Sequence, residues 1–79
     1  MYVYIIKSLV KANRHYVGIT DDPKRRLQEH NAGESTSTWK YRPWKMVWFG
    51  WFRNAKAAHN FEEYLKSGSG RTFSKRHFY

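Results

Sequence analysis

The feature that most constrains folding is the absence of cysteine from a chain of only 79 residues. A domain of this size buries only about 60% of the surface that its unfolded chain exposes. Without cysteine, neither disulfides nor thiolate zinc sites can hold the fold together, so an economical hydrophobic core must do so. Zinc fingers, cysteine nucleophiles and most small secreted scaffolds are excluded for the same reason. We expect one domain over residues 1–79.

Targeting and membrane signals are not evident in the sequence. No segment approaches the roughly 18 consecutive apolar residues of a membrane span, and the start of the chain lacks the apolar core of a signal peptide. We therefore expect a soluble protein in the reducing environment of the cytoplasm.

Charge points to the class of partner. Lys and Arg number 15 against 6 Asp and Glu, which gives a net charge of +9 and a pI near 10.1. A pI above about 9 is typical of proteins that bind polyanions such as nucleic acid. Aromatic residues make up 19% of the chain, more than so small a core is expected to bury, and exposed rings suit stacking on bases. An inert basic surface, a basic subunit of an assembly and aromatic contact with a partner protein are the alternatives.

Hydrophobic patterning predicts an α+β fold. Two β-branched and aromatic segments joined by a short polar connection predict a hairpin, and a third such segment predicts another strand. Two segments with helical features, each preceded by Asp or Asn as an N-cap, predict helices, and a basic C-terminal segment predicts a short last helix. The expected strands are residues 1–8, 15–20 and 45–52, and the expected helices are residues 23–31, 55–66 and 71–79.

The order β-β-α-β-α followed by a C-terminal segment predicts helices packed against a small antiparallel sheet. Residues 45–52 are rich in aromatic side chains, and we expect them to form the central and most buried strand. Alternation in the first strand puts Tyr2, Tyr4 and Ile6 on one face. Residues 34–40 are rich in Ser and Thr and are expected to form a loop.

Two short motifs, Tyr2-Val3-Tyr4 and Tyr16-Val17-Gly18, lie on the two strands of the expected hairpin. They are followed in order by Asp22-Pro23, Arg26, His30-Asn31, Gly33, Pro43-Trp44, Ala58, Glu62, Lys66 and Gly68-Ser69-Gly70-Arg71. This succession resembles the GIY-YIG nuclease superfamily over nearly the whole chain, and its small single-domain members in particular. The first motif departs from the family pattern by having Tyr2 in place of glycine.

The resemblance implies a metal-dependent phosphodiesterase built on a three-stranded antiparallel sheet with flanking helices. It implies DNA as the substrate and one Mg²⁺ or Mn²⁺ ion as the cofactor. It extends to the nuclease domain of nucleotide-excision-repair proteins, so a role in DNA repair is expected by analogy. Carried over by position, the implied active site consists of Tyr4, Tyr16, Arg26, His30 and Glu62.

The two tyrosines suit the activation of a water molecule. Tyr4 and Tyr16 can meet on one face of the hairpin, because facing side chains of paired strands lie about 4.5–5.5 Å apart. Ionising a phenol at pH 7 costs about 4 kcal/mol unless a neighbouring cation such as Arg26 or a metal ion lowers its pKa. We assign Tyr4 as the general base and Tyr16 to positioning the water or the phosphate. The alternative is that both are ordinary tyrosines of the sheet.

Arg26 and His30 share one helix face, since they are one turn apart. A planar guanidinium suits bidentate contact with a phosphate, and His30 could accept a proton from a tyrosine or orient it. The alternatives are a solvated basic face for Arg26, beside Lys24 and Arg25, and a charge partner of the helix C-terminus for His30.

Glu62 borders the buried stripe of its helix and can point into a cleft. One carboxylate with water and substrate oxygens commonly holds Mg²⁺, so we expect Glu62 to bind the metal. The alternative is a surface carboxylate that supports Lys66. Larger family members carry a further polar ligand, and Ser74 stands at that position here.

Many of the remaining basic residues are expected to contact the nucleic-acid backbone without reading sequence, although each could equally be a solvated charge. These residues are Lys24, Arg25, Lys40, Arg42, Lys66, Arg71, Lys75 and Arg76. Thr38 and Asn31 are candidates for orienting the site. Surface or structural roles are expected for His15, His59 and His77.

The leading hypothesis is therefore a small DNA endonuclease, with a protein partner as a possible source of targeting. A non-catalytic nucleic-acid-binding module and a partner-protein interaction module are the alternatives. The combined presence of two tyrosines, Arg26 and Glu62 favours the enzyme, because binding alone requires none of that set.

Overall fold

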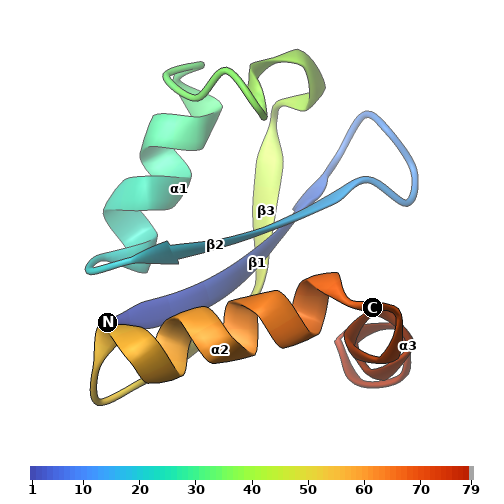
Figure 1. Ribbon diagram of the computed structural model, residues 1–79. Helices are drawn as coiled ribbons and strands as arrows, with labels where there is room; N and C mark the ends of the chain where they lie inside the picture. The colour runs from blue at the N-terminus through green and yellow to red at the C-terminus, as the bar shows by residue number, and fades with distance from the viewer. Residues whose placement is uncertain (79) are drawn as a thin grey trace.

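A computed structural model, described over residues 1–78, has a three-stranded antiparallel sheet with helices on both faces (Figure 1). The elements follow the predicted order, which confirms the α+β fold. No helix within residues 1–78 is long and apolar enough to cross a membrane. The elements are β1 (Tyr2–Ser8), β2 (His15–Thr20), α1 (Pro23–Asn31), the 3-10 helix η1 (Trp39–Tyr41), β3 (Trp44–Trp51), α2 (Ala55–Lys66) and α3 (Gly68–His77).

The central strand is β1, and the prediction that residues 45–52 form the central strand is wrong. The strand order is β2-β1-β3, so β3 lies at an edge of the sheet. Residues 3–6 of β1 are almost completely buried, whereas Phe49 and Trp51 of β3 are 53% and 64% exposed. The apolar run of β1 covers both faces, as a central strand requires. The aromatic residues of β3 raise its β propensity but do not determine its position in the sheet.

The two faces of β1 contact different helices. On one face, Val3 and Ile5 pack with Ala58 and Leu65 of α2. On the other face, Tyr4 and Ile6 pack with Trp44, and Leu27 of α1 covers them. Figure 1 shows α1 on one side of the sheet and α2 on the other.

Both long helices begin as the sequence predicts. The Asp22 side chain accepts a hydrogen bond from the amide of Arg25, and Pro23 occupies the first turn of α1. The Asn54 side chain accepts a hydrogen bond from the amide of Ala57 at the start of α2.

The last helix begins earlier than predicted. Residues 71–79 were expected to be helical, but α3 begins at Gly68, and Tyr79 lies outside the described residues. The Ser67 side chain caps α3 by accepting a hydrogen bond from the amide of Gly70. Gly70 is buried against the carbonyl of Tyr64, where a Cβ atom would collide with the backbone. The Ser-Gly-Ser-Gly segment therefore ends α2 and packs the first turn of α3 closely onto it.

Candidate active site

The ring of Tyr4 crosses β2 at a glycine. Tyr4 of β1 is paired with Gly18 of β2, and a Cβ atom at position 18 would lie 2.5 Å from the Tyr4 hydroxyl oxygen. Any larger residue at this position would displace the phenol. The glycine of the second sequence motif is thus explained by the space that the tyrosine of the first motif requires.

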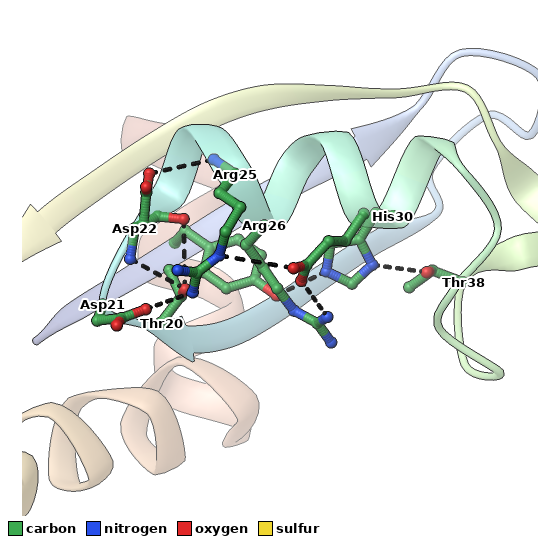
Figure 2. A network of polar contacts seen from close by, with 9 residues as sticks. Thr20, Asp21, Asp22, Arg25, Arg26, His30 and Thr38 are labelled. Atoms are coloured by element: carbon green, nitrogen blue, oxygen red, sulfur yellow. Dashed lines mark hydrogen bonds and ion pairs between the residues drawn. The ribbon is translucent and has the colours of Figure 1, made fainter.

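A buried chain of hydrogen bonds begins at that hydroxyl. The Tyr4 hydroxyl lies 2.7 Å from Nε2 of His30, and Nδ1 of His30 lies 2.7 Å from Oγ1 of Thr38. His30 and Thr38 are fully buried, and Tyr4 is 1% exposed. Figure 2 shows His30 on the last turn of α1, with Thr38 beyond it in the loop. The chain therefore links β1, α1 and the loop before η1.

Burial sets the protonation of both ring systems. Burial raises the pKa of Tyr4 to about 12; the nearby Arg26 opposes this rise, and Glu62 adds to it. Burial, and then repulsion by Arg26, lowers the pKa of His30 to about 4. At pH 7, Tyr4 is a neutral phenol and His30 a neutral imidazole. A neutral His30 cannot act as the positive partner of the α1 C-terminus, which removes the alternative that the sequence left open.

Tyr16 completes an aromatic group with Tyr4 and His30. The ring centroid of Tyr16 lies 6.3 Å from that of Tyr4 and 5.2 Å from that of His30. Tyr16 is only half-buried, in contrast to Tyr4. The two phenols therefore lie on the same face of the sheet, and Tyr16 is the one that solvent can reach.

Arg26 lies beside this group and is held by a carboxylate. Its Nη1 atom is 2.8 Å from Oε1 of Glu29. Its guanidinium lies near the Tyr4 phenol, and both neighbours raise the pKa of Arg26. Glu29 also lies 3.5 Å from Arg25, whose guanidinium pairs with Asp21. Sequence reasoning missed Glu29, although its position one turn after Arg25 and Arg26 was a usable signal. Figure 2 shows Arg25 and Arg26 on α1, with Asp21 and Asp22 at the start of the helix.

Glu62 approaches from α2, on the other side of the sheet. Its side chain is 18% exposed and lies 3.3 Å from Nζ of Lys66 and 3.7 Å from Nδ1 of His59. The carboxylate is close enough to raise the pKa of Tyr4. Four of the five predicted residues thus form one group. Glu62 lies on a second helix, and its charge is what links it to that group.

The donor set is compatible with a hard divalent cation. Within residues 1–78, no three His, Cys, Asp or Glu side chains gather into a metal site. A single carboxylate is nonetheless a common anchor for Mg²⁺, which keeps several waters and binds substrate phosphate oxygens. The partly exposed Glu62 fits this pattern, because the ion-pair partners of its oxygens, His59 and Lys66, lie at the surface of α2.

Other candidates have structural environments. Asn31 binds both backbone groups of Trp44, so it ties α1 to the start of β3. Ser74 is 1% exposed, and its hydroxyl has no hydrogen-bond partner among the described residues. His59 pairs with Glu62, and the ring of His77 packs on Phe73.

The basic residues predicted to contact nucleic acid are all exposed. They are Lys24, Arg25, Lys40, Arg42, Lys66, Arg71, Lys75 and Arg76. They do not form one patch. Lys24 and Arg25 lie on α1, Lys40 and Arg42 lie in or beside η1, and the others lie at the end of α2 and on α3.

Comparison with known proteins gives a consistent family. The profile described as the GIY-YIG catalytic domain matches residues 1–76. Structure-specific endonuclease subunit SLX1 of Candida dubliniensis is 51% identical over 51 residues, which cover 57% of this chain and 18% of the relative.

Two further relatives have longer matches. The SLX1 homolog of Giardia intestinalis is 38% identical over 65 residues, or 77% of this chain and 18% of the relative. The SLX1 subunit of Chaetomium globosum is 41% identical over 66 residues, or 76% of this chain and 20% of the relative. The chain thus spans about a fifth of the length of these curated relatives. No solved structure gives a significant match.

Proposed function

The chain belongs to the GIY-YIG catalytic-domain family, and from this premise we propose that it is a divalent-metal-dependent endonuclease that hydrolyses phosphodiester bonds in DNA. The observation that carries the proposal is the grouping of two phenols, a neutral imidazole and a guanidinium on one face of the sheet, with Glu62 of α2 close enough to raise the pKa of Tyr4. This set offers a base, a phosphate ligand and a metal ligand, which are the groups that phosphodiester hydrolysis requires.

Burial favours Tyr16 over Tyr4 as the general base, which reverses the assignment made from the sequence. The Tyr4 hydroxyl is engaged by His30, and with a pKa of about 12 its ionisation at pH 7 costs about 7 kcal/mol. Tyr16 is half-buried, so a water molecule beside the substrate can reach it. In this proposal Tyr16 first loses its own proton to solvent, and its phenolate then accepts the proton of the attacking water. Tyr4 with His30 fixes the position of the Tyr16 ring.

Arg26 is proposed to bind the phosphoryl oxygens. Its guanidinium is held by Glu29 through Nη1, which leaves its remaining N–H donors for a phosphate. The pairing orients the planar group before the substrate arrives, so less side-chain entropy is lost on binding. Glu29 therefore acts as a positioning residue.

Glu62 is proposed to hold one Mg²⁺ or Mn²⁺ ion. When bound, such an ion neutralises charge on phosphoryl oxygens and lowers the pKa of neighbouring phenols and water. Binding would require Lys66 to move away from Glu62, a small change because the Lys66 side chain is 53% exposed. Lys66 is then available to contact the nucleic-acid backbone.

The substrate and setting are inferred from the relatives. The matched proteins are named as structure-specific endonuclease subunits, and this chain has a net charge of +9. We propose that branched or otherwise irregular DNA is its substrate, that DNA repair is its setting, and that a protein partner supplies targeting. The charge supports affinity for the backbone rather than for a base sequence.

The decisive experiment compares Glu62→Gln with Glu63→Gln. Glu63 is the exposed neighbour on the same helix, so the two variants lose the same charge at adjacent positions. Labelled duplex, flap and branched DNA are incubated with Mg²⁺, Mn²⁺ or a chelator. We expect cleavage by the wild type and Glu63→Gln with metal only, and a loss on the order of 1000-fold in Glu62→Gln.

Binding of the same DNA separates the alternatives. Salt-sensitive binding by Glu62→Gln, with cleavage lost, supports the enzyme. Binding without cleavage by the wild type on every substrate and metal would leave a nucleic-acid-binding module. Equal cleavage by the wild type and Glu62→Gln would remove Glu62 from the reaction.

A further inference from the structure

A basic cleft of about 1020 Å³ lies between the β1–β2 hairpin and the C-terminal helices. Val17 and Leu65 contribute apolar surface to it. Lys11 of the hairpin lies on one side, and Arg71 and Lys75 of α3 lie on the other. Figure 1 shows the hairpin and α3 on the same side of the molecule, with the end of α2 between them.

The cleft adjoins the proposed active site through two residues. Tyr16 lines the cleft, and its ring also contacts His30. Lys66 lines the cleft as well, and its ammonium group pairs with Glu62. A polymeric substrate bound at the active site would therefore enter this cleft where it passes the end of β2 nearest the hairpin.

The charge around the cleft has one sign. Among the described residues that line it, none carries a side-chain carboxylate, whereas five are cationic: Lys11, Arg14, Lys66, Arg71 and Lys75. The opposite end of β2 leads into Asp21 and Asp22. The lining of the cleft thus attracts a polyanion without an opposing carboxylate, whereas Asp21 at the other end of β2 pairs with Arg25.

We infer that this cleft binds the phosphodiester backbone of the DNA on one side of the scissile phosphate. Lys11, Arg71 and Lys75 contact phosphates there, which positions the DNA without reading its sequence. The inference rests on the proposed function and extends it, because it gives the enzyme a one-sided grip on its substrate. It also assigns a role to Lys11, which the sequence marked only as part of a turn.

The test replaces three of the five cations that line the cleft. Lys11→Gln, Arg71→Gln and Lys75→Gln are combined in one variant, and the matched control combines Lys45→Gln, Arg53→Gln and Lys56→Gln. Both variants lose two lysines and one arginine at exposed positions, and the control residues lie outside the cleft. Binding of a fluorescein-labelled DNA duplex is measured without metal at several salt concentrations, in the full chain carrying Glu62→Gln.

The cleft variant should bind about tenfold or more weakly at low salt, and the slope of log K against log salt should fall by about 2 to 3, one phosphate contact for each cation lost. The control should keep the slope of the parent. Equal losses in both variants would show a general charge effect and overturn the inference. Should the triple variant fail to fold, Lys11→Glu alone, in the exposed hairpin, carries the same comparison.

Substrate trimming tests the one-sided grip. DNA shortened on one side of the cleavage position should lose affinity for the parent but not for the cleft variant, and DNA shortened on the other side should not. Equal losses from both sides in the parent would overturn the inference. Because the salt titration needs no cleavage, an inactive wild type would contradict the proposed function and leave the result of that titration readable.

Discussion

On one face of β1, Val3 and Ile5 form an apolar cluster with Ala58 and Leu65 of α2. On the other face, the side chain of Tyr4, which lies between Val3 and Ile5 in sequence, is hydrogen-bonded to His30. His30 is in turn hydrogen-bonded to Thr38, and all three side chains are equally buried. Both faces exclude water. They differ in what they bury: the first buries apolar side chains, and the second also buries a chain of polar groups.

The difference teaches which face serves the site. An apolar face gains free energy from every group that it buries, about 25 cal/mol for each Å². A buried chain of hydrogen bonds adds little net stability, because its hydrogen bonds mainly offset the free-energy cost of lost hydration. Each missing partner costs about 1–3 kcal/mol. The fold keeps such a chain where the neighbouring residues, Tyr16 and Arg26, are partly exposed. The apolar face stabilises the domain, and the polar face holds chemical groups in fixed positions.

The largest effect on stability should come from the apolar face. Ile5→Ala removes a fully buried side chain from the packing against α2, and the unfolding free energy should fall by about 4 kcal/mol. Urea unfolding followed by circular dichroism measures this change. The cleavage rate of the folded fraction should remain close to that of the wild type, since the side chains of Ile5 and Tyr4 lie on opposite faces of β1. Loss of activity in a sample shown to be folded would contradict the division between the two faces.

Tyr4→Phe is the comparison on the opposite face. It leaves the packing of the ring in place and removes only the hydroxyl that His30 contacts. Unfolding should become easier by only about 1 kcal/mol, whereas cleavage should fall at least tenfold. Near-normal cleavage with a large stability loss would reverse the roles of the two faces.

The next effect is a pH dependence specific to the polar face. The pKa of His30 is lowered from 6.5 to about 4, so between these values the unfolded chain binds a proton that the folded chain does not. Stability from this group is therefore complete above about pH 6.5 and is lost as the pH falls towards 4, by about 3 kcal/mol in total. Urea unfolding at several pH values measures the loss.

His30→Gln supplies the reference for that measurement, because carboxylates also titrate in this range. The wild type should lose about 3 kcal/mol more than His30→Gln between pH 7 and pH 4. His59→Gln, at an exposed position, should behave like the wild type. Parallel pH curves for the wild type and His30→Gln would show that His30 is not buried as a neutral ring.

The fold could be predicted largely from local signals. The hairpin, the caps at Asp22 and Asn54, and the periodicity of α2 each depend on residues near one another in sequence. The place of β3 at the edge could not be predicted in this way, because it depends on how strands pair across the chain. The early start of α3 was missed because Gly68 and Gly70 are poor helix formers, and close packing against α2 outweighs their propensity.

The sequence was enough to predict which candidate residues lie close together, but not which of the two phenols is buried. Alternation placed Tyr4 and Tyr16 on one face, and helical spacing placed Arg26 with His30. Which phenol is buried depends on Gly18 and on the fit of α1 over the sheet, and neither can be measured from sequence. The cleft beside Lys11 likewise arises only when the hairpin meets α3.

Gly18→Ala should show an intermediate effect that depends on Tyr4. The new methyl group would lie 2.5 Å from the Tyr4 hydroxyl oxygen, so the ring must move, and stability should fall by about 2 kcal/mol. In a Tyr4→Leu background there is no ring to displace, and the cost of Gly18→Ala should nearly vanish. Unfolding of the four proteins in this double-mutant cycle measures the coupling. An unchanged cost in the Tyr4→Leu background would mean that Gly18 is required for another reason.

The smallest effect, and the most specific one, concerns Thr38. Its hydroxyl is the partner of Nδ1 of His30, so it decides which imidazole nitrogen carries the proton. Thr38→Val keeps the shape and removes the hydroxyl; stability should fall by about 1 kcal/mol and cleavage several-fold. Thr38→Ser should restore both, and Thr36→Val, exposed in the same loop, should change neither. Nitrogen NMR shifts of His30 should report one tautomer in the wild type and Thr38→Ser and a mixture in Thr38→Val, whereas one tautomer in all three would show that Tyr4 alone fixes the ring.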